Sequence, residues 1–188
     1  MKIARWFVAL AMSAGLSSPA STARPETSRR SVSESREIQG YPCAKGYAWF
    51  YADDRLERCF LSRETQFGEA KVPAGSVVVL LPDGRPNFVM LAHDSFIGSY
   101  KCRGGGPLGP TEGDSTAFYP SGKLKQCWLA DDETVQGVPC KDAGGFLTAI
   151  FHPSGFPTDF YETGRLRRCT LSKDYGGKRR GDVFTQAP

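Results

Sequence analysis

The sequence predicts an all-β protein, an antiparallel meander of repeated β-hairpins that forms an elongated or curled sheet stapled by disulfides. Three observations predict this fold class. One strand–turn–strand phrase recurs along the chain, and no segment after the N-terminus keeps the apolar period of a helix for three turns. Six cysteines follow a segment with the pattern of an export signal.

Residues 1–23 have the pattern of a signal peptide. Lys2 and Arg5 supply a positive start, an apolar run spans 6–16, and small residues lead to cleavage after Ala23, with Ala20 as the alternative. The apolar run is shorter than the ~20 residues that a spanning helix needs, and no later segment is apolar enough to cross a bilayer. We therefore expect a secreted or periplasmic protein without a transmembrane segment.

Residues 24–38 are expected to be a flexible tether, and residues 39–188 a single β-hairpin repeat domain. The tether is rich in Ser, Arg and Glu, so it buries too little apolar surface to offset its ordering entropy. The net charge is +4, but basic and acidic residues nearly balance from residue 39 onward. The composition therefore disfavours a nucleic-acid partner, which needs a basic face, and we interpret a local basic excess over 165–180 as solvated surface.

The recurring phrase begins with two apolar or aromatic residues and continues through a turn, a basic residue, and Leu or Pro into a second strand. Its copies are Phe50–Leu61, Leu80–Leu91, Phe118–Leu129 and Phe160–Leu171, with a degenerate fifth turn at Pro153-Ser154-Gly155. A single hairpin is marginally stable in water, so neighbouring copies must pack together to form a core.

The turn residues explain why each copy folds back on itself. Gly84, Gly122 and Gly164 tolerate the positive φ of tight hairpin turns, and Asp54 stands in place of Gly in the first copy. We expect two-residue turns such as Asp83-Gly84. After the second strand, most copies continue with an acidic residue and then a Gly, which we interpret as the turn into the next hairpin.

A two-residue turn would also set the register of each hairpin. Under this prediction Tyr119 lies opposite Leu124, and Tyr161 lies opposite Leu166. Cross-strand aromatic–aliphatic pairs of this kind each contribute about 0.2–1 kcal/mol to the stability of a sheet.

The copies Phe118–Leu129 and Phe160–Leu171 resemble MORN-type hairpin repeats, in particular the bacterial MORN-variant repeat of antitoxin-like proteins. The shared features are the aromatic pair, the Gly turn, the basic residue, the Leu and a later Gly. The resemblance covers most of residues 45–180 and implies a binding role, because MORN-like proteins mostly serve as interaction scaffolds. The cysteines depart from the usual intracellular repeat.

The six cysteines are expected to form disulfides, because an even number of cysteines follows an export signal. One cysteine of each expected pair follows a hairpin turn at a constant distance, and the other precedes the same hairpin. The hairpin that turns at Gly84 lacks both members, as paired partners would. The absence of a C-x-x-C motif and of a Cys/His cluster disfavours redox catalysis and a metal site. The repeat therefore predicts Cys43–Cys59, Cys102–Cys127 and Cys140–Cys169.

The sequence contains no catalytic signature, so we expect a protein that is not an enzyme and uses no cofactor or metal. The histidines are His93 and His152. Ser95, His93 and Asp94 are close in sequence, which does not bring their side chains into the geometry of a catalytic triad. The carboxylates lie mainly at predicted turns and are explained by turn chemistry; a glycosidase pair and a calcium site at 131–133 are the alternatives.

Four aromatic residues on or beside predicted strands are the candidates for binding: Trp49, Phe60, Tyr100 and Trp128. In a single-layered sheet some of them face solvent and mark an interface, whereas in a curled sheet they fill the core. We predict a non-enzymatic binding or structural module of the cell envelope that recognises a protein partner through one sheet face. The alternatives are an immunity- or inhibitor-like protein that neutralises an exported toxin, and a carboxylate-dependent envelope hydrolase.

Overall fold

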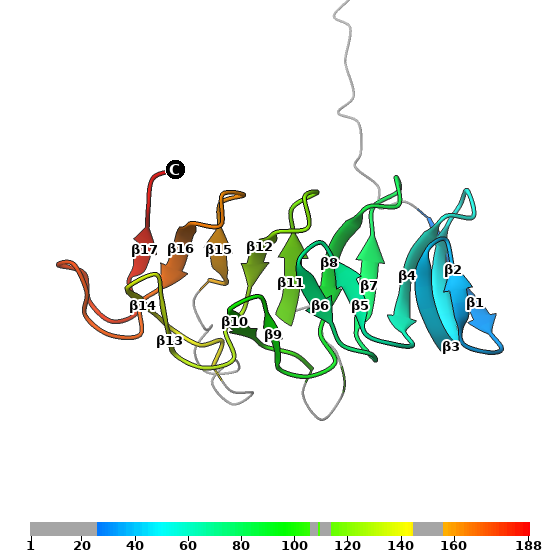
Figure 1. Cartoon of the computed structure of the whole chain (residues 1–188), viewed down its shortest axis with the longest axis horizontal. Helices are drawn as coiled ribbons and strands as arrows, with labels where there is room; N and C mark the ends of the chain where they lie inside the picture. Colours follow the sequence, from blue (N-terminus) through cyan, green and yellow to red (C-terminus); the bar gives the residue numbers. More distant parts are fainter. Residues whose placement is uncertain (1–25, 106–108, 110–113, 145–155) are drawn as a thin grey trace, which may run out of the picture.

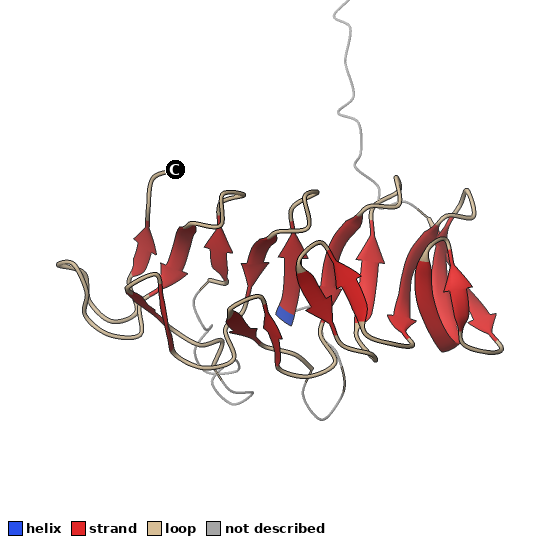
Figure 2. Cartoon of the chain, viewed as in Figure 1, coloured by secondary structure: helices blue, strands red, loops and turns tan. Residues whose placement is uncertain are grey.

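The structure is a computed structural model that describes residues 26–105, 109, 114–144 and 156–188. The predicted signal peptide, the turn at Ser154-Gly155 and His152 lie outside these residues. The described part of the chain is all-β, with no α-helix, and its strands form one large antiparallel meander with smaller sheets beside it (Figure 1). Figure 2 shows the same strands and the loops between them. The predicted fold class is therefore confirmed.

The large sheet has 11 strands and follows chain order, so the predicted hairpins stand side by side along it. The four predicted copies are the long hairpins β3–β4, β7–β8, β11–β12 and β15–β16. The strands of this sheet are β1 (Thr27–Val32), β2 (Arg36–Ile38), β3 (Tyr41–Tyr51), β4 (Leu56–Leu61), β7 (Val77–Leu80), β8 (Pro86–Met90), β11 (Ser115–Phe118), β12 (Leu124–Cys127), β15 (Thr158–Phe160), β16 (Leu166–Thr170) and β17 (Val183–Thr185).

The turns of the long hairpins are one residue longer than predicted. In β7–β8, the N–H of Gly84 donates to the carbonyl of Leu81, and the N–H of Leu81 donates to the carbonyl of Arg85, both at 2.8 Å. Gly84 has a φ of 83°, whereas Asp83 has no positive φ. A two-residue type I′ turn needs positive φ at both positions, so the chain forms a type I turn followed by one left-handed residue.

The longer turn shifts the register by one residue from the prediction. Phe118 rather than Tyr119 opposes Leu124, and likewise Phe160 rather than Tyr161 opposes Leu166. A β-bulge recurs beside this pair in every long hairpin, with the extra residue on the second strand. In three of these hairpins a Tyr directly follows the first residue of the pair, and its hydroxyl contacts the next strand pair or strand along the sheet. The Tyr119 hydroxyl donates to the carbonyl of Phe160 at 2.9 Å, which links one hairpin to the next. Equivalent bonds run from Tyr51 to Leu80 and from Tyr161 to Gln186.

Short hairpins form a second layer at the places between long hairpins where the sequence pattern predicts simple turns. They lie in a row along the large sheet, and β6 contacts β9 (Figure 1). Gln39 and Gly40 in the turn from β2 to β3 both have positive φ, as do Gln136 and Gly137, so these are two-residue type I′ turns. The short strands are β5 (Thr65–Phe67) with β6 (Ala70–Val72), β9 (Ser95–Ile97) with β10 (Tyr100–Cys102), and β13 (Glu133–Val135) with β14 (Val138–Cys140). β2 and the first three residues of β3 pair in the same way, so we count them as the first short hairpin although β3 continues into the large sheet.

The main hydrophobic core lies between the two layers. The large sheet contributes fully buried leucines, and the short hairpins contribute residues such as Val72, Ile97 and Val135. Neither layer covers its own apolar face, so each short hairpin is stable only against the long hairpins beneath it. The core leucines include Leu56, Leu61, Leu80, Leu91, Leu129, Leu166 and Leu171.

Two glutamines fasten short hairpins to long turns. The Gln136 side chain donates to the carbonyl of Gly164 at 2.8 Å and accepts from the N–H of Leu166 at 3.0 Å. Gln39 makes the same pair of bonds to Asp54 and Leu56. Both residues hold a left-handed conformation that glutamine rarely adopts, and these bonds offset the strain.

We expect Gln136→Ala to lower the free energy of unfolding by about 1–3 kcal/mol, because it leaves a partly buried N–H and a carbonyl without partners. Urea unfolding followed by fluorescence measures the change. Gln66→Ala is the matched control, since the Gln66 amide bonds only to Gly68 in its own exposed hairpin. An equal loss in both variants would contradict the fastening role of Gln136.

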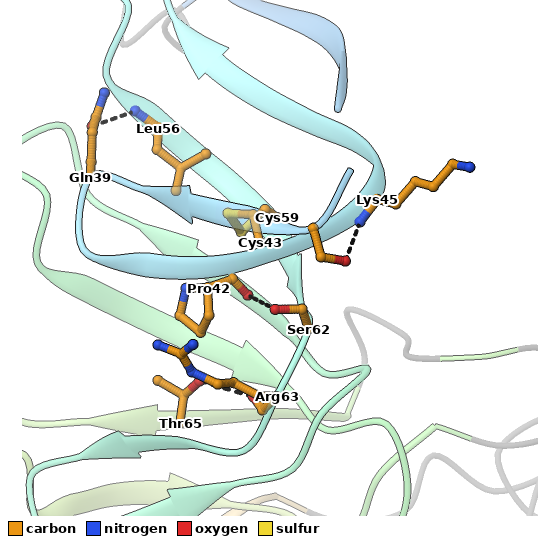
Figure 3. Close-up of a disulfide and its surroundings, with 10 residues drawn as sticks. Gln39, Pro42, Cys43, Lys45, Leu56, Cys59, Ser62, Arg63 and Thr65 are labelled. Atoms are coloured by element: carbon orange, nitrogen blue, oxygen red, sulfur yellow. Dashed lines mark hydrogen bonds between the residues drawn. A yellow bond between two sulfur atoms is a disulfide. The ribbon is translucent and has the colours of Figure 1, made fainter. Parts of the chain in front are cut away.

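The three disulfides join the predicted pairs, Cys43–Cys59, Cys102–Cys127 and Cys140–Cys169, each with a Cα–Cα distance of 5.7 Å. Each links the end of a short hairpin to the second strand of the next long hairpin, and all six cysteines belong to the core between the layers. Figure 3 shows the first of these bridges, Cys43–Cys59. In the hairpin without cysteines, Val72 and Val89 occupy the equivalent positions of the repeat, and both are fully buried. The covalent links thus cross the interface between layers.

The structure differs from the prediction of a flexible tether over 24–38. Thr27–Val32 and Arg36–Ile38 form β1 and β2, both of which pair with β3. The composition misled because ordering here comes from backbone hydrogen bonds to the long β3 rather than from burial of many apolar side chains. Val32 is the one buried residue of β1, and Arg30 forms an ion pair with Asp54.

Candidate functional site

The face of the large sheet opposite the short hairpins, which we term the outer face, carries three of the four predicted binding residues. Side chains alternate between faces along a strand, so a residue between two core residues points outward. Trp49 lies between the buried Ala48 and Phe50. Phe60 and Trp128 each directly follow a buried disulfide cysteine and precede a buried leucine. These three aromatics therefore lie on the outer face.

Tyr100 lies elsewhere. It belongs to the short hairpin β9–β10, and its ring stacks on buried Phe160 with 4.8 Å between centroids. Gln136 Nε2 lies 3.3 Å from the Tyr100 hydroxyl. Tyr100 thus packs against the core between the layers, and the structure does not bring it together with Trp49, Phe60 and Trp128.

The strand register places apolar residues of the outer face next to one another. One row across the strands runs Trp49, Arg58, Val79, Phe88, and the neighbouring row runs Phe60, Val77, Met90. Val77, Val79 and Met90 form a second cluster of buried residues, separate from the main core, with Phe88 packed against it. Phe60 is 37% exposed at the edge of this cluster. The centre of the face is therefore apolar and rimmed by larger aromatic side chains.

Arginines stack on the aromatic rings of this face. The guanidinium of Arg58 lies 4.6 Å from the ring centroid of Trp49, that of Arg168 lies 4.9 Å from Phe156, and that of Arg29 lies 4.5 Å from Tyr47. Arg168 also pairs with Asp159 at 2.6 Å. Cation–π contacts and ion pairs hold the planar guanidinium groups flat against the sheet, where they remain partly exposed.

A polar hollow of about 590 Å³ lies beside the connections between long and short hairpins, with His93, Asp94, Arg103 and Asp142 in its lining. One oxygen of Asp94 accepts from the N–H of Gly104 at 2.9 Å, and Asp132 accepts equivalently from the N–H of Asp142 at 2.9 Å. These matched bonds confirm the interpretation of the two acids as turn residues, since each closes the chain after a short hairpin.

The neighbouring Ser95 and His93 make a local contact. Ser95 Oγ lies 3.1 Å from His93 Nδ1, but the hydroxyl donates to the carbonyl of His93 at 2.8 Å. His93 Nδ1 lies 3.0 Å from the carbonyl of Asp94. The serine proton is thus directed to the backbone rather than to the imidazole, an arrangement that stabilises a turn and does not activate the serine.

Glu133 on β13 has a raised pKa because burial disfavours its charge, and the nearby Asp131 raises it further; a bond from the backbone of Lys101 opposes both effects. The folded protein therefore binds a proton at Glu133 more tightly than the unfolded chain does. The stability that proton binding at Glu133 contributes is fully present below the ordinary pKa of the carboxyl group, and it is lost as pH rises through the raised pKa.

We accordingly expect Glu133→Gln to unfold at a higher urea concentration than the parent near pH 7, because the amide carries no charge to desolvate. The advantage should shrink as pH falls through the raised pKa toward the ordinary value of 4.5. Urea unfolding of both proteins at a series of pH values measures the difference. If the difference in unfolding urea concentration between the two proteins stays constant with pH, the Glu133 carboxyl does not titrate as described.

Comparisons with family models, curated proteins and solved structures found no match to the chain. The resemblance to MORN-type repeats therefore stays a prediction. Within the described residues, no group of three His, Cys, Asp or Glu side chains is placed to hold a metal ion. That same part of the chain has no helix of the length and hydropathy that crossing a membrane requires.

Proposed function

We propose that this protein is an exported binding module of the cell envelope that docks a protein partner through its outer face. The composition of that face carries the proposal. Protein interfaces are enriched in Trp, Tyr, Phe, Met and Arg, and their hot spots are aromatic or Arg side chains around a desolvated centre. Trp49, Phe60 and the stacked Arg58 border the apolar cluster of Val77, Val79 and Met90, and Trp128 and Arg168 lie further along the same face.

The charges on the face indicate the chemistry of the partner. Arg29 and Arg58 lie toward one end of the sheet and Arg168 toward the other, with Glu57 and Asp159 as the acids next to Arg58 and Arg168. A partner that presents apolar side chains flanked by carboxylates would complement both the centre and the rim. Stacking already holds the guanidinium groups, so less conformational entropy is lost when the partner binds.

Export supports a partner outside the cytoplasm. The N-terminal signal pattern predicts secretion or a periplasmic location, and disulfides persist in such oxidising compartments. Neutralisation of an exported toxin is one form that protein binding by this face would take. The hydrolase alternative gains no support from the contacts of Asp94, whose carboxylate is used in closing a turn.

Photo-crosslinking tests which face meets the partner. A benzophenone side chain at Phe60 on the outer face is compared with one at Phe96, which is 67% exposed on the short hairpin β9–β10. Envelope extract supplies the partner, and mass spectrometry identifies the adduct. We expect one defined adduct from position 60 and none from position 96. Adducts at position 96 alone, or the same adducts from both positions, would overturn the proposal.

Substitutions then measure the energetics with the identified partner. We expect Phe60→Ser to weaken binding at least tenfold, about 1.4 kcal/mol, because it removes an aromatic side chain at the rim of the apolar centre. Phe96→Ser is the matched control, with an exposed Phe removed from the other layer. Titration calorimetry on both folded variants gives the ratio, and equal affinities would contradict docking on the outer face.

A further inference from the structure

A hollow of about 480 Å³ lies among the tips of the hairpins, on the side of the short hairpins rather than the outer face. Charged residues make up 23% of the chain, yet none of the described residues that line this hollow is Asp, Glu, Lys or Arg. Its lining combines aromatic rings, prolines, hydroxyls and amides, and its volume is in the range of small-ligand sites. The residues that carry this chemistry are Gln39, Tyr41, Gln66, Phe67, Tyr119 and Ser121.

Stacked aromatic rings form one wall of the hollow. Tyr41 stacks on Phe67 with 6.2 Å between centroids, and Phe67 stacks on Phe118 at 5.9 Å. Tyr41 lies at the start of β3, where it pairs with β2, Phe67 lies in the short hairpin β5–β6, and Phe118 lies in the long hairpin β11–β12. The wall is therefore built by the packing of the two layers. Pro86 and Pro120 add further rigid apolar surface.

Several polar groups around the hollow already donate hydrogen bonds within the protein. The Tyr41 hydroxyl donates to Gly84, the Gln66 amide to Gly68, and the Tyr119 hydroxyl to Phe160. A hydroxyl that donates one bond still accepts others, and an amide oxygen accepts two. The hollow therefore presents acceptors, the remaining amide N–H groups, the Ser121 hydroxyl and apolar rings, so it suits a neutral ligand with many hydroxyl groups.

A second hollow, of about 410 Å³, follows one repeat further along the same row of tips. Gly68 and Gly122 meet back to back between the two hollows, since a Cβ added to Gly122 would lie 2.3 Å from the Gly68 Cα. The second hollow is lined by Tyr100, Ser99 and Thr163, and Glu69 and Lys123 also line it. The two hollows thus share aromatic and hydroxyl groups, but the lining of the second one is charged.

We infer that the hollow among Tyr41, Gln66, Phe67 and Ser121 binds a neutral glycan chain. The hydroxyls of a sugar donate to the acceptors of the hollow, and its C–H faces pack on the aromatic and proline rings. An ionic ligand would leave its charge without a partner here, at a high desolvation cost. This site lies on the opposite side of the sheet from the outer face, so glycan binding and protein docking can occur together.

The test uses the oxidised protein, labelled with ¹⁵N, and three neutral probes: hexa-N-acetylchitohexaose, cellohexaose and maltohexaose. A probe concentration of about 10 mM nearly saturates a single site that has a millimolar dissociation constant, so weak binding can be measured. We expect at least one probe to shift the amide signals of Gly40, Gln66 and Gly122 along a saturating curve. A proline-rich peptide is titrated in parallel, and saturable shifts at this hollow with the peptide alone would overturn the glycan assignment.

Variants separate this site from other causes of a shift. Ser121→Phe places a bulky ring in the hollow at an exposed turn position, and we expect at least a tenfold loss of glycan affinity. Glu162→Phe is the matched control in the turn of β15–β16, outside the lining of either hollow. Phe60→Ser should retain glycan binding, so a failure of the outer-face proposal is distinguishable. No shift with any probe, or full binding by Ser121→Phe, would overturn the inference.

Discussion

The double substitution Val72→Cys/Val89→Cys is expected to form a fourth disulfide and to raise the free energy of unfolding by about 2–4 kcal/mol. Val72 ends a short hairpin, as Cys43, Cys102 and Cys140 do, and Val89 has the position of their partners. Both valines are fully buried in the same core cluster. The new bridge would close a loop similar to that of Cys43–Cys59, whose partners are 16 residues apart.

Thiol titration in denaturant, without reductant, counts the free cysteines of this variant, and urea unfolding measures its stability. The single variants Val72→Cys and Val89→Cys control for the exchange of a valine for a thiol, and neither should gain stability. Two titratable thiols in the purified double variant, or a bridge without any gain in stability, would show that the two positions are not equivalent to the natural pairs.

Gly122→Ala is expected to destabilise the protein far more than Gly84→Ala does. The two glycines have the same place in their hairpin turns and nearly the same φ, 81° and 83°. Left-handed backbone costs a residue with a Cβ roughly 1–2 kcal/mol, which both variants share. A Cβ on Gly84 meets nothing within 4 Å, whereas one on Gly122 would lie 2.3 Å from the Gly68 Cα, so overpacking adds about 1–3 kcal/mol.

Urea unfolding of the two variants gives the comparison, and hydrogen exchange shows where the extra cost falls. We expect faster exchange in Gly122→Ala at the amides of β5 and β6, because the short hairpin must move away from the long turn. Equal destabilisation by the two substitutions would contradict the close contact between the layers.

The long hairpins were predictable because each carries a left-handed Gly or Asp between two runs of strand-forming residues. Their turn type was not, because Asp83-Gly84 is compatible with a two-residue turn and only the structure shows that Asp83 lacks the positive φ this turn requires. The short hairpins escaped prediction for a different reason. Strands such as Thr65–Phe67 and Ala70–Val72 are too short to show alternation, and a left-handed Gln39 has no signal in composition.

The candidate site was partly predictable. A cysteine that must reach the other layer points inward, so the residue after Cys59 or Cys127 points outward, which places Phe60 and Trp128 on one face. The same alternation places Tyr100 on the inward face with Cys102, two residues later, but its ring contact with Phe160 depends on the short-hairpin layer. The neutral hollow likewise depends on two layers meeting, and no local pattern brings Tyr41, Phe67 and Phe118 together.

The two-layered fold depends on short hairpins that are each linked by a disulfide, or by packed valines in one copy, to the long hairpin that follows. Digestion of the mature protein without reductant, followed by mass spectrometry of the cross-linked peptides, tests that arrangement directly. The structure predicts three linked peptides, joining Cys43 to Cys59, Cys102 to Cys127 and Cys140 to Cys169. A peptide that joins Cys59 to Cys102 would contradict it.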